Sequence, residues 1–235
     1  MQPIPNISPL SPGPSAMALE GVRLQRGNTC VFDDFTLALP ESRIGLIGDN
    51  GAGKSSLFRL LSGLDRPQTG RVLVPEGVQA VGMMFQNPDD QIIFPTVEEE
   101  LALSLQHASL TRAQAQQHVR EVLQARGLAA WASRAIASLS QGQRQHVCWL
   151  ALALAPHRVL LLDEPFASLD LPGQVALKHE IEQAPQQVLV STHVLAHVRH
   201  FERVIWLDQG RVRADGAGAK VCAAYEANVA SRAVV

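Results

Sequence analysis

The chain has 235 residues, of which 46% are hydrophobic and 18% are charged, and its formal net charge is −2. This composition is typical of a globular protein and offers no basic tract for binding nucleic acid. Its apolar runs are shorter than the ~20 residues that a membrane-spanning helix requires, so we expect membrane association to come through a partner. The three cysteines, Cys30, Cys148 and Cys222, lack metal-ligand spacing and are expected to be reduced, buried thiols of a cytosolic protein.

Residues 1–16 contain five prolines and little that could pack, so we predict a disordered leader there. The leader lacks the basic start and apolar run of a signal peptide. A folded domain is predicted over residues 17–235, and Met17 is a candidate for the natural start.

The elements that follow predict an α/β core. Short alternating apolar runs in residues 18–39 predict antiparallel strands, and IGLIG, residues 44–48, predicts a buried strand that leads into a helix. Residues 97–140 are rich in alanine, glutamine, leucine and glutamate, and they predict a helical insert. VLLLDEP and VLVSTH then indicate buried parallel strands, each followed by helix-like sequence. The order predicts an α/β core with an antiparallel β subdomain and an α-helical insert.

The segment between the buried strand and its helix is GDNGAGKSS, which has the glycine, lysine and serine spacing of a phosphate-binding loop. Its glycines let successive N–H groups converge on phosphate oxygens, and the helix presents its positive end to the same anion. We expect Lys54 to reach the β- and γ-phosphates of ATP and Ser55 to supply an oxygen to Mg²⁺. The predicted nucleotide-binding residues of this loop are Gly48, Asp49, Asn50, Gly51, Ala52, Gly53, Lys54, Ser55 and Ser56.

Two carboxylates, Asp163 and Glu164, end the buried strand VLLLD. Charges in such a place are costly without a cation. We expect Asp163 to hold Mg²⁺ through water, and Glu164 to polarise the water that attacks the γ-phosphate. Taken alone, the motif is also compatible with a solvated strand end, and its weight comes from the phosphate loop.

These motifs resemble the ATP-binding subunits of ABC transporters, which are P-loop NTPases, and the resemblance extends over residues 18–216. Four further segments follow in that family's order and spacing: FQNPDDQ with Gln86, the signature loop LSQGQ, SLD with Asp170, and STH with His193. The resemblance implies an ATPase in which Glu164, His193 and Gln86 are catalytic.

The resemblance also implies that hydrolysis needs two subunits. Ser140, Gly142 and Gln143 of the signature loop would contact the γ-phosphate held by the other subunit, through a hydroxyl, backbone N–H groups and a helix N-terminus. Asp170 is an implied nucleotide contact too, and Gln86 would contact the metal ion and the attacking water. ATP would then hold the dimer together, and loss of the γ-phosphate would release it.

Three positions depart from the family's pattern. Gln141 replaces a glycine of the signature loop, and His146 stands where arginine is common. The family usually stacks an aromatic residue on adenine, and the aligned residue here is Arg26, whose planar guanidinium can also stack on a base. The alternative for Arg26 is a solvated strand residue.

Within the family, FQNPDDQIIFPTVEEELA is most similar to the ATPases of energy-coupling factor transporters, which import vitamins and transition-metal ions. The resemblance implies that residues 87–95 bind an integral membrane subunit, at the cytoplasmic face of the plasma (inner) membrane. Ile92, Ile93 and Phe94 form an apolar cluster there, which indicates an interaction site if it is exposed. The alternative is that the cluster packs the helical insert onto the core.

Two other functions are open at this point. A soluble ABC-type ATPase acting on nucleic acid should carry a second ATPase half, a long coiled coil or a basic surface. A P-loop nucleotide kinase would leave LSQGQ, SLD and STH without an explanation. We therefore predict a peripheral ATPase subunit that pairs with an identical or paralogous ATPase subunit and powers import through the membrane subunit.

Overall fold

The computed structural model describes residues 16–233. The predicted leader therefore lies outside the described residues, except for Ala16. The strands are β1 (Met17–Arg26), β2 (Thr29–Leu39), β3 (Arg43–Ile47), β4 (Thr69–Leu73), β5 (Val81–Met84), β6 (Val159–Asp163), β7 (Gln187–Ser191), β8 (Arg203–Asp208) and β9 (Arg211–Gly216). The α-helices are α1 (Lys54–Leu61), α2 (Val97–Leu103), α3 (Arg112–Ala125), α4 (Gln141–Leu154), α5 (Leu171–Gln183) and α6 (Gly218–Ala233).

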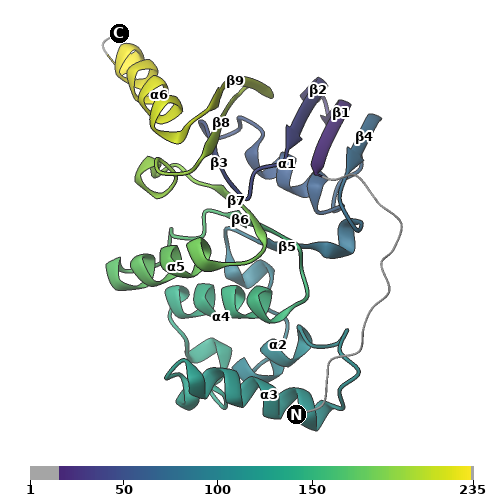
Figure 1. Ribbon diagram of the computed structural model, residues 1–235, viewed down its shortest axis with the longest axis vertical. Coiled ribbons are helices and arrows are strands. Elements are labelled where there is room, and N and C mark those ends of the chain that lie inside the picture. The colour runs from purple at the N-terminus through teal and green to yellow at the C-terminus, as the bar shows by residue number, and fades with distance from the viewer. Residues whose placement is uncertain (1–15, 234–235) are drawn as a thin grey trace.

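Two sheets make up the β structure. The larger has the order β5-β6-β7-β3-β8-β9, and its neighbouring strands are parallel except for β8 and β9. The smaller sheet, β2-β1-β4, is antiparallel and stands beside the larger one (Figure 1). This arrangement confirms the α/β core with an antiparallel β subdomain that the sequence predicts.

The apolar core forms two clusters, because successive side chains along the central strands point to opposite faces of the sheet. On β7, Leu189 belongs to the apolar cluster that α1 and the antiparallel sheet share. Its neighbours Val188 and Val190 belong to a second cluster, which includes α4 and α5. The central sheet is therefore covered on both faces, and the loops at its strand ends are left to form a site.

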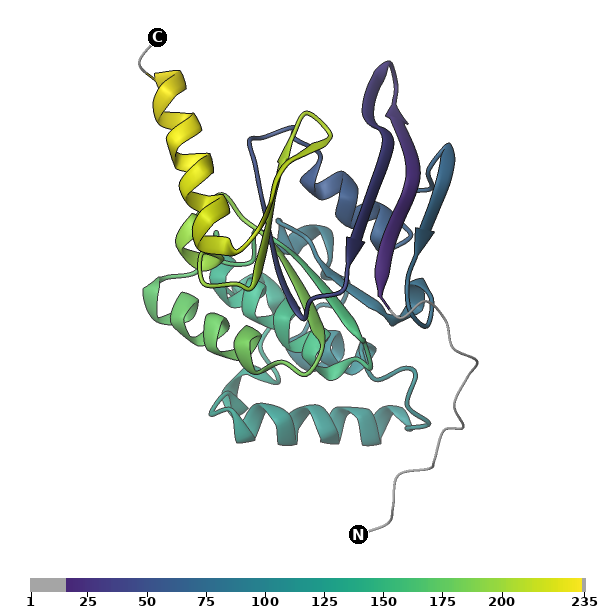
Figure 2. The ribbon, with the colours of Figure 1, turned by 45° about the horizontal axis from the view of Figure 1, so that its top comes forward.

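Helices α2 and α3 lie within the range of the predicted helical insert and are placed at one end of the molecule, with α6 at the other (Figure 1). Figure 2 shows the same separation from a second direction. Thr96 caps α2 by accepting a hydrogen bond from the N–H of Glu99, and α3 begins with a capping box between Thr111 and Gln114.

Two sequence predictions are wrong in detail. The segment after β7 forms only a 3₁₀ turn, η5 (Leu195–His197), because Val198 directly after it is fully buried and draws the chain back onto the sheet. Cys148 and Cys222 are buried thiols, as predicted, but Cys30 is exposed because it lies on the solvent side at the start of β2.

Candidate nucleotide-binding site

The predicted phosphate loop joins β3 to α1. Gly48, Gly51 and Gly53 all have positive φ angles, of 144°, 80° and 110°. A Cβ on Gly48 would stand 2.2 Å from the carbonyl oxygen of Leu207, so this turn requires glycine. The loop ends where α1 begins, which directs the first N–H groups of the helix towards the same space.

Lys54 is the first residue of α1, and its side chain turns back over the loop. Its Nζ donates hydrogen bonds to the carbonyl oxygens of Gly48 (2.7 Å) and Asp49 (3.0 Å). Burial lowers the pKa of Lys54, and the carboxylates of Glu164, Asp163 and Asp49 oppose this shift. The ammonium group therefore stands in a partly dehydrated site where an anion would gain more from it than in water.

The pair of Ser55 and Asp163 forms the next part of the site. Ser55 Oγ donates a hydrogen bond of 2.6 Å to Asp163 Oδ2, and Asp163 is 6% exposed at the end of β6. A hydroxyl and a carboxylate are hard oxygen donors of the kind that Mg²⁺ prefers. The two residues thus fit the magnesium site that the sequence predicts.

Glu164 follows directly and is 8% exposed. Its φ angle is 49°, an uncommon value for a residue with a side chain, and such values cluster at functional sites. The N–H of Glu164 donates to the carbonyl oxygen of Ser191 at the end of β7. His193 Nδ1 lies 2.9 Å from Glu164 Oε2, so the two predicted catalytic side chains are in contact.

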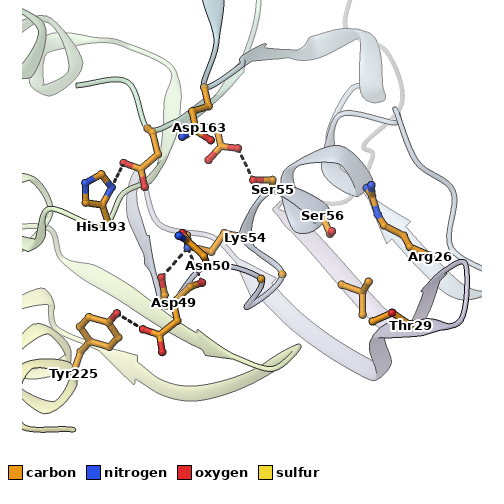
Figure 3. A pocket seen from close by; sticks show the side chains of 16 residues that line it. Arg26, Thr29, Asp49, Asn50, Lys54, Ser55, Ser56, Asp163, His193 and Tyr225 are labelled. Carbon is orange, nitrogen blue, oxygen red and sulfur yellow. Dashed lines mark hydrogen bonds and ion pairs between the residues drawn. The ribbon is translucent and has the colours of Figure 1, made fainter. Parts of the chain in front are cut away.

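These groups line one open cavity of about 940 Å³ between the two sheets (Figure 3). Its size suits a nucleotide, since ligand pockets measure about 300–1,000 Å³. Its walls include every predicted residue of the phosphate loop except Ala52, whose side chain is buried. The lining residues are Arg26, Thr29, Val31, Gly48, Asp49, Asn50, Gly51, Gly53, Lys54, Ser55, Ser56, Gln86, Asp163, Glu164, His193 and Tyr225.

The comparisons with known proteins agree with this geometry. The family profile described as "ABC transporter" matches residues 32–167, which include the phosphate loop, the signature loop and the carboxylates at the end of β6. The chain belongs to the ABC transporter family. It is an ATP-binding subunit and an ATPase of that family, and this assignment excludes the nucleotide kinase that the sequence left open.

Among its relatives is the biotin transport ATP-binding protein BioM of Rhodobacter capsulatus, 44% identical over 89% of this chain and 94% of the relative. BioM of Rhizobium etli is 35% identical over 88% of this chain and 96% of its own. The energy-coupling factor transporter ATP-binding protein EcfA of Methanoculleus marisnigri is 37% identical over 75% of this chain and 69% of its own.

Solved structures share the fold. The protein cbiO1 of Clostridium perfringens, described as part of the ABC transporter complex cbiONQ, superposes with a TM-score of 0.74 at 24% identity, over 90% of this chain and 92% of its own. A dimeric ATP-binding cassette bound to ADP and Pi superposes with a TM-score of 0.73 at 23% identity, over 86% of this chain and 98% of its own. Within residues 16–233 of this ABC ATPase, no helix combines the length and the apolar character needed to cross a bilayer.

The signature residues of the ABC ATPase lie outside the nucleotide cavity. Ser140, Gly142, Gln143 and Asp170 line a separate hollow of about 320 Å³. Ser140 caps α4 in a capping box with Gln143, and Asp170 caps α5 by accepting a hydrogen bond from the N–H of Gly173. One chain therefore brings together the phosphate loop with Asp163, Glu164, His193 and Gln86, but not with the signature residues.

The departure at Gln141 has a structural explanation. Gln141 is the first residue of α4 and is exposed, so this position needs no glycine. Position 142 does require glycine, because a Cβ there would stand 2.6 Å from the carbonyl oxygen of Ser168. His146 is half-buried, burial lowers its pKa, and its ring stacks edge-on against Trp131.

The apolar cluster after Gln86 is split by the fold. Ile92 packs against the core, whereas Ile93 is 74% exposed and Phe94 is 38% exposed. The carboxylate of Glu100, itself buried, accepts hydrogen bonds from the N–H groups of Ile93 (2.9 Å) and Phe94 (2.8 Å). The packing alternative therefore describes Ile92, whereas Ile93 is largely exposed and Phe94 is partly exposed.

Sequence reasoning missed several residues in and around the cavity, including Thr29 and Val31 of β2, which line it. Asp65 pairs with Arg26, and Tyr225 and Arg232 of α6 both bond the Asp49 side chain. Asp49 and Arg232 are 183 positions apart, and neither α6 residue belongs to a motif, so no local pattern signals these contacts.

Proposed function

We propose that this ATPase powers an importer of the energy-coupling factor type and that the imported solute is biotin. The observation that carries the proposal is the 44% identity to a biotin transport ATP-binding protein over 94% of that relative's length. The sequence alone left vitamins and transition-metal ions open, and a second biotin-transport relative favours the vitamin. In this proposal the solute passes through the membrane partner, and the subunit lies at the cytoplasmic face of the membrane.

The cavity supports a division of roles in hydrolysis. The phosphate loop and Lys54 bind the triphosphate, and Ser55 and Asp163 hold Mg²⁺, which when bound would neutralise charge on the β- and γ-phosphates. Glu164 orients and polarises the attacking water. His193, whose ring contacts Glu164, binds the γ-phosphate. A second ATPase subunit supplies its signature loop, because Ser140 cannot reach this cavity from within the same chain.

We propose that residues 87–95 bind the membrane partner through Ile93 and Phe94. It begins next to Gln86, which lines the cavity, and Asp89 within it pairs with Arg144 of α4 (3.3 Å). A movement of Gln86 in the cavity, or of Arg144 in α4, would therefore displace the segment that carries Ile93 and Phe94. Glu100 belongs to α2 and accepts hydrogen bonds from the N–H groups of Ile93 and Phe94, so the exposed pair is attached to that helix and would move with it.

The experiment replaces Ile93 with Asp and Phe94 with Ser together. We expect the variant to keep its thermal unfolding midpoint and its ATPase activity, because both side chains are exposed. It should no longer copurify with the membrane subunit, and cells that carry it should not take up labelled biotin. Val212→Asp, at an exposed valine on β9, is the matched control and should still assemble.

Two results would contradict the proposal. A folded Ile93→Asp, Phe94→Ser variant that still assembles and transports would remove the docking role. Uptake of labelled Co²⁺ rather than biotin by cells with the unmodified protein would remove the assignment of the solute. Lys54→Ala serves as the reference for a subunit that assembles but cannot power uptake.

A further inference from the structure

Helix α6 reaches back to the phosphate loop and binds its one acidic side chain. Tyr225 Oη donates a hydrogen bond of 2.6 Å to Asp49 Oδ1, and Arg232 Nη1 donates one of 2.7 Å to Asp49 Oδ2. Figure 3 shows the Asp49 side chain turned towards Tyr225, while Lys54 bonds the backbone of the loop. Both carboxylate oxygens of Asp49 are thus occupied by a helix from the far end of the chain.

The position of Tyr225 is fixed by the core. Its ring packs edge-on against Trp206 of β8, with centroids 5.2 Å apart, and Trp206 is 6% exposed. Val221 and Cys222 anchor the first half of α6 in the same cluster. Burial, and then the contact with Asp49, raise the pKa of Tyr225 to about 12, so its hydroxyl remains a donor at neutral pH.

Asp49 poses an electrostatic problem for an ATP site. Hydrogen bonds from Arg232 and Tyr225 lower the pKa of Asp49, so its carboxylate is ionised at neutral pH. A negative charge in this loop repels a triphosphate and competes with it for Lys54. The contacts from α6 offset that charge and turn it away from the ammonium group.

We propose that α6 is a latch on the phosphate loop, in which Tyr225 and Arg232 are positioning residues that hold Asp49 clear of the incoming phosphates. ATP affinity then depends on where α6 lies. This inference goes beyond the proposed function, because it concerns nucleotide binding by the isolated subunit and does not depend on the solute or the membrane partner.

The test compares Arg232→Gln with the unmodified full-length protein in calorimetric titrations with Mg-ATP. The ion pair is half-exposed, so we expect the Kd to rise by about threefold to tenfold, and by less at high salt. The KM for ATP should rise with it while kcat changes little, because the latch acts on binding rather than on the attacking water. Arg232→Lys, which keeps the charge, should recover most of the affinity.

A double-mutant cycle with Asp49→Asn separates the latch from other roles of α6. In the Asp49→Asn background, Arg232→Gln should change the Kd by less than about twofold, since the charge to be offset is gone. Glu226→Gln removes another ion pair of α6, with Arg199, and is the matched control that should leave the Kd unchanged.

Three outcomes would overturn the latch. The Kd could be unaffected by Arg232→Gln, it could rise equally in the Asp49→Asn background, or Glu226→Gln could raise it as much. Because the titration needs only the purified subunit, its failure would leave the importer proposal standing, and a failed uptake experiment would leave the latch standing.

Discussion

The phosphate-loop cavity and the signature hollow are both lined by predicted nucleotide contacts, yet only the first is completed within one chain. Around the phosphate loop, Lys54, Ser55, Asp163, Glu164 and His193 already contact one another or the loop. Around the signature, the Ser140 and Asp170 side chains only cap helices. In the proposed dimer the signature surface of one subunit would complete the phosphate-loop cavity of the other.

The largest effect is expected inside the complete cavity. Glu164→Gln keeps the shape of the side chain but loses the carboxylate, so it should bind ATP and hydrolyse it more slowly by a factor on the order of 10²–10⁴. An ATP-bound dimer should accumulate, which sedimentation with and without Mg-ATP would detect. Turnover at the unmodified rate would show that another residue polarises the water.

A smaller effect is expected at the signature surface. Ser140→Ala removes the hydroxyl that we propose donates to a charged phosphate held by the other subunit. Such a hydrogen bond is worth ~1.5–3 kcal/mol, or about tenfold to a hundredfold in turnover. ATP affinity of the isolated subunit should change little, because Ser140 lies outside the nucleotide cavity. Steady-state ATPase assays and ATP titrations measure the two quantities separately.

Thr111→Ala is the matched control for this prediction. Thr111 caps α3 with the same capping box that Ser140 forms on α4. Each substitution should lower the free energy of unfolding by ~1 kcal/mol through the lost cap. If Thr111→Ala slows hydrolysis as much as Ser140→Ala, the effect at Ser140 is one of stability, and the two-subunit site loses its support.

The sequence was sufficient to place residues whose motif also determines the local backbone. The glycines of the phosphate loop are required by its backbone, and Asp163 and Glu164 follow directly from a buried strand, so spacing alone predicts their position. The split of the apolar cluster could not be predicted, because only the tertiary placement of Glu100 determines that Ile93 points outward. Motif spacing is local, whereas burial depends on the whole fold.

The contacts made by α6 show the same limit more strongly. Asp49 belongs to a motif, but Tyr225 is 176 positions away and lies in a helix of mostly small residues with no functional pattern. The prediction of a helix after β7 was wrong for a related reason. The burial of Val198 in the core outweighs the local helical preference of that segment. Pairings between distant segments are set by packing.

The smallest effect is expected at the rim of the cavity, where Arg26 was predicted to stack on adenine. Its guanidinium pairs with Asp65, which Arg59 of α1 also binds at 3.1 Å, so the side chain is held at the cavity wall. Arg26→Ala should raise the KM for ATP by about twofold to fivefold with little change in kcat, because stacking stabilises ground and transition states alike.

The comparison that decides the role of Arg26 uses inorganic tripolyphosphate, which has no base to stack. Its Kd should be unaffected by Arg26→Ala if Arg26 contacts adenine, whereas an equal loss for ATP and tripolyphosphate would show that the guanidinium acts through its charge. Arg23→Ala, on the same strand and with a similarly exposed side chain, is the matched control and should change neither affinity. Unchanged ATP affinity in Arg26→Ala would leave Arg26 as a solvated strand residue paired with Asp65, and the base would have to be held by Thr29 and Val31 of β2.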